Sequence, residues 1–595
     1  MKNRTFATLS LIAAAALTWG GLTPKPANAC GGFFCSAANP VNQAAEQIIF
    51  SDNGDGTITA VIQIMYEGPA ESFAWLLPIP GVPDVEVSSN AALDRLNNAT
   101  NPTYQLNTVF DGDCNFGFPT TAAAPMADGD FGNESAPNPV SVLAEKQVGP
   151  YDSVTIAVDP TTEDAAQAAV DWLTDNGYDV TDIGPDVLRP YLDDGLNLVA
   201  FRLTKGNSSG AIRPVMITYD SDLPLIPIRP TAVAATEDMP IKVWVLSNER
   251  AIPKNYKGLI LNEALIDWFN PSDTYNEVVS KAADEAGGQG FVTEFAGSTD
   301  AFMDTIVFQW ERQTWMDFSS TTFASDVEMY NQATQNWAGW DGFDEALAAA
   351  VTLPEDVDFD DLQLCFLCYS NDVGFAFDQG EFLTRLFEDV IKPMWDTQDL
   401  IDSRPYMTRL YTTMSADEMS LDPIFDFNPD LGDVSNVHVA DRVVGCPDNG
   451  DPNAQPWTVE LDQGDTVMGT EFGVWPIDIE DEPAALQILQ YGTSGEGEMV
   501  TDNGPMITDM INDQNDATMN GDDEPAADDP GGPSMLAGDD TGDPGLDDGA
   551  AGSGDGVQKK GDSGCAVGGD DAGTSLGLWA AALGLLALRR RRRTA

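Results

Sequence analysis

The closest-spaced cysteine pair in the chain, Cys365-Phe-Leu-Cys368, has the spacing of a redox motif. A Cys-X-X-Cys pair at a helix N-terminus has one thiol of lowered pKa, and such a thiol exchanges disulfides. Here the flanking residues are apolar, no βαβ pattern surrounds the pair, and Tyr369 stands where a haem-attachment motif requires histidine. We therefore expect a structural disulfide and keep thiol–disulfide exchange as the alternative.

Seven cysteines occur in the chain, and six of them precede the C-terminal segment. Six cysteines in an exported domain are enough for three disulfides, in any of 15 pairings. Zinc is a weaker prediction because the chain has one Cys-X-X-Cys pair and a single histidine. The candidate disulfide cysteines are Cys30, Cys35, Cys114, Cys365, Cys368 and Cys446.

Other catalytic motifs are missing or lie in the wrong context. His438 is the only imidazole, and the chain has no H-E-x-x-H, Walker A or G-x-G-x-x-G pattern. Residues 206–210 match G-x-S-x-G, but the segment after them is strand-like, so we expect a hairpin loop. Residues 51–56 resemble a calcium loop, but Ser51 and Ile62 replace the acidic ligands, so a turn is expected there. The catalytic residues therefore stay unknown.

Charge excludes one class of function and leaves two others open. With 28 Lys and Arg against 96 Asp and Glu, the chain carries −68 and should repel nucleic acid. No metal site or cofactor is predicted, although calcium binding by the acidic residues stays possible. A hydrolase that uses two facing carboxylates would need no histidine and would leave no recognisable spacing, so it stays as an alternative.

These residues must be positioned by a mixed fold, because strand and helix patterns both occur. Thr57–Tyr66 is rich in β-branched residues and follows a turn, and Leu196–Thr204, Ala211–Tyr219 and Lys242–Leu246 are also strand-like. Helical periodicity marks Ala165–Leu173, with Trp172 and Leu173 buried. Further helices are expected at Asn262–Phe269, at Tyr275–Glu285 and over most of 299–385, where Trp310, Trp315, Trp337 and Trp340 should form a core. We predict an α+β fold, β-rich at the N-terminal side with a helical middle.

The N-terminus has the features of a secretory signal peptide. Two basic residues precede an apolar run from Phe6 to Trp19, and small residues follow, so cleavage is expected between Ala29 and Cys30. The leucine that a lipoprotein signal places three residues before the cysteine is missing. An unlipidated Cys30 in a disulfide is therefore the favoured interpretation.

The C-terminus predicts a membrane anchor. The uncharged stretch Ala572–Leu588 precedes five arginines, 589–593, which would hold the end of the chain in the cytoplasm. Cys565, this helix and the arginine block resemble, in that order, the MYXO-CTERM sorting tail of myxobacterial surface proteins. The resemblance implies a sorting protease that cuts the tail and a lipid anchor at Cys565.

Between the fold and this tail lies a segment of different composition. Residues 512–558 are dominated by Asp, Gly and Pro and contain no aromatic residue, so they cannot offset the entropy of ordering with buried apolar surface. We therefore predict a signal peptide at 1–29, an ectodomain at 30–500 with a possible subdomain boundary near 118–147, an acidic disordered linker at 501–564, and the sorting tail at 565–595.

Six segments of the chain, taken in order, carry a family resemblance. They are CGGFFC at 30–35, YEGPAESFAWLLPIPG at 66–81, VGPYDS at 148–153, TYDSDLPLIPIRPTAV at 218–233, VWVLSNERAIPKNY at 243–256 and RPYMTRLYTTMSADEMSLDPIF at 404–425. Together they resemble the bacterial family called domain of unknown function 2330 (DUF family 2330). That family has no established activity, so the resemblance transfers no catalytic position and implies an exported, envelope-associated protein. The stretch around Cys365 and Cys368 has no counterpart in it.

Together these features predict a non-enzymatic protein displayed on the cell envelope. Its partners should be the membrane, through the C-terminal helix or a lipid, and the sorting protease, with no nucleic acid. The ligand is unknown. The paired-carboxylate hydrolase and the thiol–disulfide protein are the alternatives.

Overall fold

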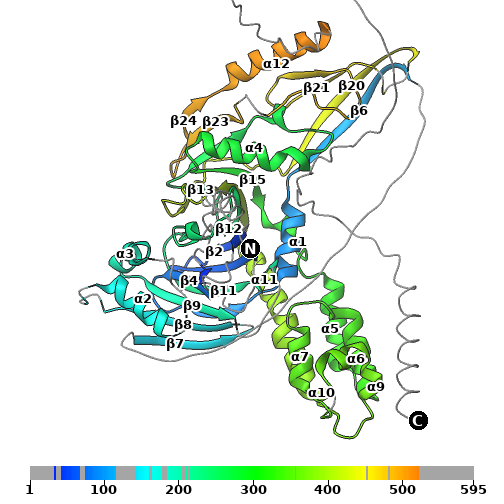
Figure 1. Cartoon of the computed structure of the whole chain (residues 1–595). Helices are drawn as coiled ribbons and strands as arrows, with labels where there is room; N and C mark the ends of the chain where they lie inside the picture. The colour runs from blue at the N-terminus through cyan, green and yellow to red at the C-terminus, as the bar shows by residue number, and fades with distance from the viewer. Residues whose placement is uncertain are drawn as a thin grey trace, which may run out of the picture.

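The computed structural model describes most of the predicted ectodomain (Figure 1). The predicted signal peptide and cleavage site at Ala29 and Cys30 lie outside the described residues, as do Cys35, Cys565 and the predicted transmembrane helix. The described residues are 33–34, 42–67, 74–114, 141–149, 151–159, 162, 164–176, 178, 184–203, 210–211, 213–355, 357–450, 453, 455–479 and 483–520.

An 11-stranded mixed sheet forms the centre of the molecule. Its strands β2 and β12 are parallel neighbours although about 200 residues separate them in the chain. Listed by position, the strands are β24 (Glu498–Asp502), β23 (Ala485–Gln490), β14 (Lys257–Leu261), β15 (Gly290–Ser298), β18 (Tyr406–Met414), β12 (Met239–Ser247), β2 (Asn42–Asp52), β3 (Thr57–Glu67), β11 (Val215–Asp220) and β5 (Asp84–Val87), with β10 (Gly210–Ala211) beside β3.

The hairpin of β2 and β3 follows directly from its sequence. Gly54 and Gly56 have φ values of +73° and +89°, which glycine adopts without steric cost, and the Asn53 amide N–H donates to the Thr57 carbonyl. This is the predicted turn and not a calcium loop. Alternate residues of β2 then face opposite sides of the sheet, so Ile48 and Phe50 enter one core and Ile49 enters another.

A five-stranded sheet packs on the face of the central sheet that carries Ile48 and Phe50. Its strand β4 is buried on both sides, because Trp75, Leu77 and Ile79 face the central sheet and Leu76 faces helices α2 (Ala165–Asp175) and α3 (Pro185–Asp193). Trp172 and Leu173 of α2 are buried as predicted. In order, the strands are β1 (Phe33–Phe34), β4 (Ala74–Ile79), β9 (Asn197–Leu203), β8 (Tyr151–Ala157) and β7 (Ser141–Val148).

Helices cover the opposite face of the central sheet. Leu93 and Leu96 of α1 (Asn90–Thr100) pack with Ile49, and Met394 and Ile401 of α11 (Lys392–Asp402) join the same cluster. Farther along the sheet, α4 (Pro271–Glu285) buries Val278, Val279, Ala282 and Ala283 against β14, β15 and β18.

The chain between β15 and β18 forms a mainly helical region at one end of the molecule (Figure 1). Trp315 and Trp337 pack in its core, as predicted, and Trp340 packs against it partly buried. Trp310 is 63% exposed, so the prediction of a core position was wrong for Trp310. The elements are α5 (Gln309–Ser320), α6 (Asp326–Trp337), α7 (Phe343–Ala350), β16 (Val351–Thr352), α8 (Phe359–Leu364), α9 (Phe366–Tyr369), β17 (Ala376–Phe377), α10 (Gln379–Arg385) and the π-helical turn η5 (Leu386–Ile391), which continues into α11.

A four-stranded sheet with helix α12 lies at the other end (Figure 1). Ile507 and Ile511 of α12 are buried against this sheet, so residues up to 520 belong to the fold. The predicted linker start at 501 is therefore wrong, because β24 and α12 occupy its first part. The elements are β22 (Thr466–Gly469), β21 (Trp457–Glu460), β20 (Val437–Gly450), β6 (Thr103–Cys114) and α12 (Gly504–Asn520).

Two other local predictions were also wrong. The expected helix at 262–269 is only the 3-10 turn η3 (Glu263–Leu265), stabilised by Asn262 Oδ1 accepting from the Ala264 N–H. The expected hairpin at 206–210 required its flanking strands to pair, but β9 and β11 lie in different sheets. The remaining short elements are η2 (Thr231–Val233), β13 (Ala251–Pro253), η4 (Thr299–Phe302) and β19 (Phe425–Phe427).

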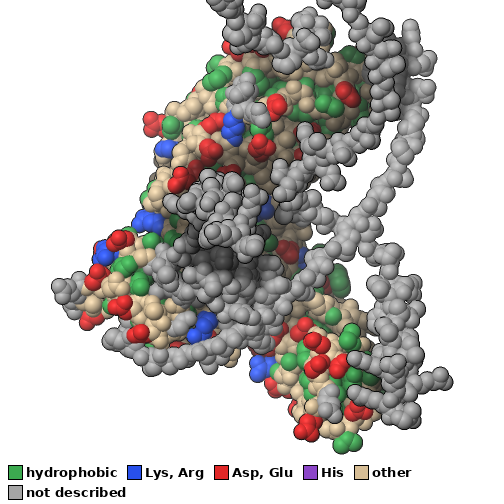
Figure 2. Space-filling model, viewed as in Figure 1, with side chains coloured by type: hydrophobic (Ala, Val, Ile, Leu, Met, Phe, Trp, Pro, Cys, Tyr) green, Lys and Arg blue, Asp and Glu red, His purple; other side chains and the backbone are tan. Residues whose placement is uncertain are grey.

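The fold is α+β, with a β-rich N-terminal part and helices in the middle. Acidic side chains are spread over the visible surface, and basic ones are fewer (Figure 2). Among the described residues, no helix has the length and apolar content that crossing a bilayer requires.

Candidate functional site

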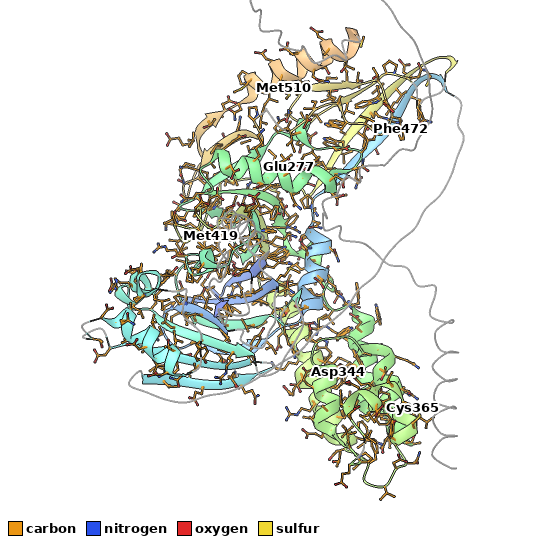
Figure 3. All side chains as sticks on the ribbon, viewed as in Figure 1. Glu277, Asp344, Cys365, Met419, Phe472 and Met510 are labelled. Carbon is orange, nitrogen blue, oxygen red and sulfur yellow. A yellow bond between two sulfur atoms is a disulfide. The ribbon has the colours of Figure 1, made fainter. Side chains whose placement is uncertain are left out.

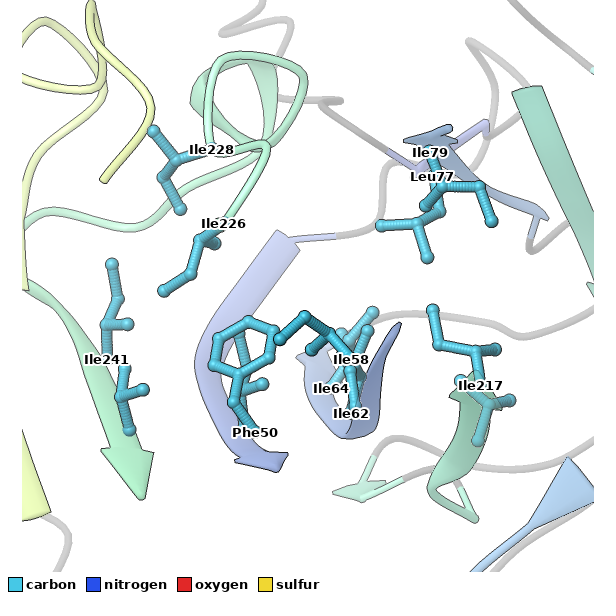
Figure 4. Close-up of a cluster of buried hydrophobic side chains, with 14 of the residues drawn as sticks. Phe50, Ile58, Ile62, Ile64, Leu77, Ile79, Ile217, Ile226, Ile228 and Ile241 are labelled. Atoms are coloured by element: carbon cyan, nitrogen blue, oxygen red, sulfur yellow. The ribbon is translucent and has the colours of Figure 1, made fainter. Parts of the chain in front are cut away.

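An apolar cavity of about 150 Å³ lies between the two packed sheets. One wall is the central sheet, the second is β4, and the third is the loop after β11, which contributes Leu225, Ile226 and Pro227. Figure 4 shows side chains from all three walls turned toward the same space. Representative lining residues are Ile48, Phe50, Ile62, Trp75, Leu77 and Ile226.

The local sequences explain why this space is apolar on every side. Strands β2, β3 and β11 each present alternate branched or aromatic side chains to it, including Phe50 and Ile217. Pro78 sits inside β4, where it pairs with Leu198 of β9 and where β1 does not extend. Proline there limits further strand pairing, so the end of β4 stays available as a wall of the cavity.

Glu46 is the one acidic residue among the described residues that line the cavity. Its side chain is on the same face of β2 as those of Ile48 and Phe50. Its in-register neighbours are Ile64 on β3 and Ile241 on β12. The side chain is 6% exposed, and Gln43 Nε2 donates a hydrogen bond to its Oε2 at 3.2 Å. A carboxyl group is thus held between two isoleucines with a single amide donor.

Burial controls the charge of Glu46. Removal from water raises the pKa of Glu46 to about 7, and the hydrogen bond from Gln43 lowers it only in part. At neutral pH the carboxyl group is therefore close to half ionised. A group with this property in an apolar pocket is suited to recognise a hydrogen-bond donor or a cation, and it marks the cavity as a candidate binding site.

The carboxylate arrangement expected of the alternative hydrolase does not occur in this cavity, because Glu46 has no acidic partner among the described lining residues. Asp284 and Glu418 do form a carboxyl pair, but they are hydrogen-bonded directly to each other at the surface. Burial and the Asp284 charge raise the pKa of Glu418. Such a pair leaves no space between the two groups for a glycosidic bond.

None of the cysteines that the structure describes lies on an element that lines the cavity. Cys365 and Cys368 form a disulfide in the helical region, with an S–S distance of 2.06 Å (Figure 3). Cys365 precedes the four-residue helix α9, and Cys368 is exposed. Cys446 is also disulfide-bonded but is 5% exposed, and Cys114 ends strand β6.

His438, the only imidazole, has a structural environment. Its ring stacks on Tyr104 at 4.5 Å, and its Nδ1 lies 2.7 Å from Glu263 Oε1. Tyr104 packs against the hydrophobic cluster that includes the four-stranded sheet, and Glu263 begins the 3-10 turn η3. Across the described part of the chain, no three His, Cys, Asp or Glu side chains gather as metal ligands, and the acidic segment considered for calcium after residue 520 lies outside it.

Comparison with known protein families gave one match. A family described as an uncharacterized protein conserved in bacteria (DUF2330) matches residues 24–360, more than half of the chain. The chain belongs to the DUF2330 family. No curated protein and no solved structure matched the chain.

The DUF2330 match includes the whole cavity, since its lining residues run from Glu46 to Thr231. Cys365, Cys368 and the segment 404–425 lie beyond the matched residues. Two segments noted in the sequence, 66–81 and 218–233, provide β4 and the loop that form two of the three cavity walls. The sequence analysis did not single out Glu46, although an acidic residue two positions before Ile48 and four before Phe50, on the same face of a strand, is a recognisable signal.

Proposed function

We propose that this DUF2330 protein is a non-enzymatic binding protein displayed on the cell envelope, and that the cavity between its sheets takes a small apolar amine. The observation that carries the proposal is Glu46, a carboxyl group in an otherwise apolar cavity with a pKa raised to about 7. The volume of about 150 Å³ suits a single ring or a short alkyl chain, since apolar cavities of this size hold benzene.

An amine suits this site better than a neutral group of the same shape. The cost of removing Glu46 from water is already incurred when the protein folds, and a buried carboxylate without a cationic partner stays unfavourable. A ligand ammonium compensates that charge, and charge-assisted hydrogen bonds are about twice as strong as neutral ones. The apolar walls supply the remaining affinity by removing the ligand body from water.

Calorimetric titration of the full chain with benzylamine and benzyl alcohol at pH 8 tests this proposal. We expect benzylamine to bind about tenfold more tightly than the alcohol, because Glu46 is mostly ionised there. Glu46→Gln should remove the preference while leaving the alcohol bound. Equal affinities in the wild type, or a preference that survives in the variant, would contradict the proposal.

Two isoleucines close in sequence, Ile226 and Ile228, provide a test variant and a matched control for whether the ligand binds in the cavity. Ile226 lines the cavity, whereas Ile228 belongs to the same core and is equally buried but does not line it. Ile226→Ala and Ile228→Ala should each lower the free energy of unfolding by about 2–5 kcal/mol. Only Ile226→Ala should admit a larger amine such as naphthylmethylamine.

Display on the envelope is proposed from the sequence alone. The signal peptide, the acidic segment after residue 520, Cys565, the apolar stretch and the arginine block occur in the order that an exported and sorted protein requires. Deleting 565–595 should release the protein into the medium, measured by immunoblot of cells and medium. Unchanged retention of the truncated protein on the envelope would refute this part of the proposal.

A second candidate function is thiol–disulfide exchange at Cys365 and Cys368, which the exposure of Cys368 favours. Attack on a disulfide requires access to a sulfur atom, so this bond should be reduced before the buried one at Cys446. Titration with a dithiol, alkylation and peptide mass spectrometry should show Cys365 and Cys368 labelled first. Simultaneous labelling of Cys446 in the folded protein would count against this function.

A further inference from the structure

A second polar site lies on the helix-covered face of the central sheet, opposite the Glu46 cavity. Four side chains stand in one row across neighbouring strands: Gln63 pairs with Gln47, Gln47 with Lys242, and Lys242 with Tyr411. Apolar residues such as Val61, Ile49 and Trp244 lie next to this row and pack under α1. The row is therefore a strip of polar groups in the middle of a sheet face.

Lys242 is a cation without a close anionic partner. Of the described carboxylates, none lies within 4.0 Å of its ammonium group, and Asp94 and Glu294 act on it only at longer range. Its contacts are Asn97 Oδ1 at 3.5 Å and the Tyr411 ring at 5.8 Å. Burial and the neighbouring Arg409 lower the pKa of Lys242.

The neighbouring Arg409, unlike Lys242, has a close anionic partner. Its Nε lies 2.5 Å from Glu294 Oε2, and both side chains are 1% exposed. Glu294 also accepts a hydrogen bond from the Tyr275 hydroxyl at 2.7 Å, so its carboxylate is fully engaged. Glu294 is thus engaged by Arg409 and Tyr275, and Lys242 has the carboxylates of Asp94 and Glu294 only at longer range.

The glutamines of the row are also incompletely bonded. Gln47 is 6% exposed, and its side-chain amide makes no hydrogen bond to any residue that the structure describes. Gln63 is 1% exposed and donates to Asn90 Oδ1, but its Oε1 has no partner. Buried amides are normally hydrogen-bonded, so an unbonded amide next to an uncompensated ammonium indicates a group that is supplied from outside.

A large pocket opens beside the row. Its volume is about 570 Å³, its floor includes Tyr411, Thr413 and Pro240, and α4 forms a wall with Asn276 and Glu277. Pro240 and Thr413 are paired and lie two residues from Lys242 and Tyr411, so they share the same face of the sheet. Figure 3 shows Glu277 on α4 above this part of the sheet. Tyr411 is the member of the row that lines this pocket, and Lys242 is the in-register neighbour of Tyr411.

We propose that Lys242, with the amides of Gln47 and Asn97, binds the carboxylate of a small zwitterionic ligand such as an amino acid or a betaine. The carboxylate would pair with the ammonium group and accept from the unbonded amide. The pocket beside Tyr411 is lined by three acidic residues, Asp238, Glu277 and Asp284, and by one basic residue, Lys281. This excess of negative charge disfavours a multiply charged anion and favours a ligand that also carries a positive group. This site is independent of the Glu46 cavity.

Competitive lysine acetylation of the full chain tests the proposal without any substitution. At pH 8 and constant ionic strength, saturating glycine betaine should lower acetylation of Lys242 about tenfold, as measured by peptide mass spectrometry. Lys254, which is exposed and paired with Asp426, is the internal control and should not change. Acetate should protect Lys242 more weakly than betaine, and phosphate should protect it least.

Variants identify the group responsible. Lys242→Met should abolish betaine binding in calorimetry, whereas Lys281→Met should retain it, because the Lys281 ammonium already donates to the Ile479 carbonyl. The proposal is overturned if Lys242 and Lys254 change equally, if phosphate protects Lys242 best, or if betaine binds the Lys242 variant as tightly as the wild type. The labelling result on the unmodified chain decides the question even if Lys242→Met does not fold.

Discussion

Replacing Arg409 by methionine should lower the free energy of unfolding by about 3–5 kcal/mol, the largest loss expected from one substitution outside the apolar core. The change leaves the Glu294 carboxylate buried without its cation. It also removes hydrogen bonds from the guanidinium to Thr100 Oγ1 at 2.8 Å and Asn101 Oδ1 at 2.6 Å, which connect β18 to the end of α1. Urea denaturation of the wild type and the variant at pH 7 measures the difference.

A surface ion pair provides the control for this prediction. Arg312 and Asp399 lie 3.1 Å apart, but their side chains are 26% and 67% exposed, so Arg312→Met should cost no more than about 1 kcal/mol. Adding Glu294→Gln to Arg409→Met should restore part of the loss, because it removes the unpaired charge. If Arg409→Met lowers the free energy of unfolding by less than about 1 kcal/mol, the interactions of Arg409 with Glu294 and with the end of α1 do not stabilise the fold as described.

The second large effect is a pH-dependent gain of stability in Glu46→Gln. Folding raises the pKa of Glu46 from 4.5 to about 7, so the unfolded chain loses this proton first as the pH rises. The free energy of unfolding of the wild type should therefore fall between pH 4.5 and 7, by about 3 kcal/mol from this group. Glutamine does not ionise, so the variant should be more stable than the wild type at pH 8 and nearly equal to it at pH 4.5.

Chemical denaturation at both pH values, with an exposed strand glutamate as control, measures this effect. Glu460 is the exposed last residue of β21, and Glu460→Gln should change the free energy of unfolding by less than about 0.5 kcal/mol at either pH. A Glu46→Gln variant with no pH-dependent gain would mean that the carboxyl group is solvated in the folded protein.

Local sequence signals predicted the local elements well. The β-branched run of β3, the turn before it and the apolar spacing of α2 each depend on neighbouring residues, and each was confirmed. Helix α12 was missed because the linker predicted from the composition of residues 512–558 was extended back to 501. That extension overlooked Ile507 and Ile511, which lie four residues apart on one helix face. The expected helix at 262–269 did not form because strand β14 ends at Leu261 and the Asn262 side chain then accepts a hydrogen bond from the Ala264 N–H, which closes only a 3-10 turn.

The candidate sites depend on long-range pairing, and this is why the sequence did not show them. Glu46 is buried because β12 lies beside β2 and places Ile241 next to it. The same parallel pairing brings Lys242 beside Gln47, and β18 then adds Tyr411. The sequence of a single segment does not show which strands will pair with it. The two sites could therefore be identified only once the order of the strands in the sheet was known.

The most direct test of the amine-binding cavity is a ¹³C NMR titration of the Glu46 side-chain carboxyl group, assigned by comparison with Glu46→Gln. The structure predicts a pKa of about 7 in the free protein. Saturating benzylamine should lower this pKa by about one unit or more, because an ammonium group beside the carboxylate stabilises its charged form. A pKa near 4.5 in the free protein, or a raised pKa that benzylamine leaves unchanged, would contradict the proposed function.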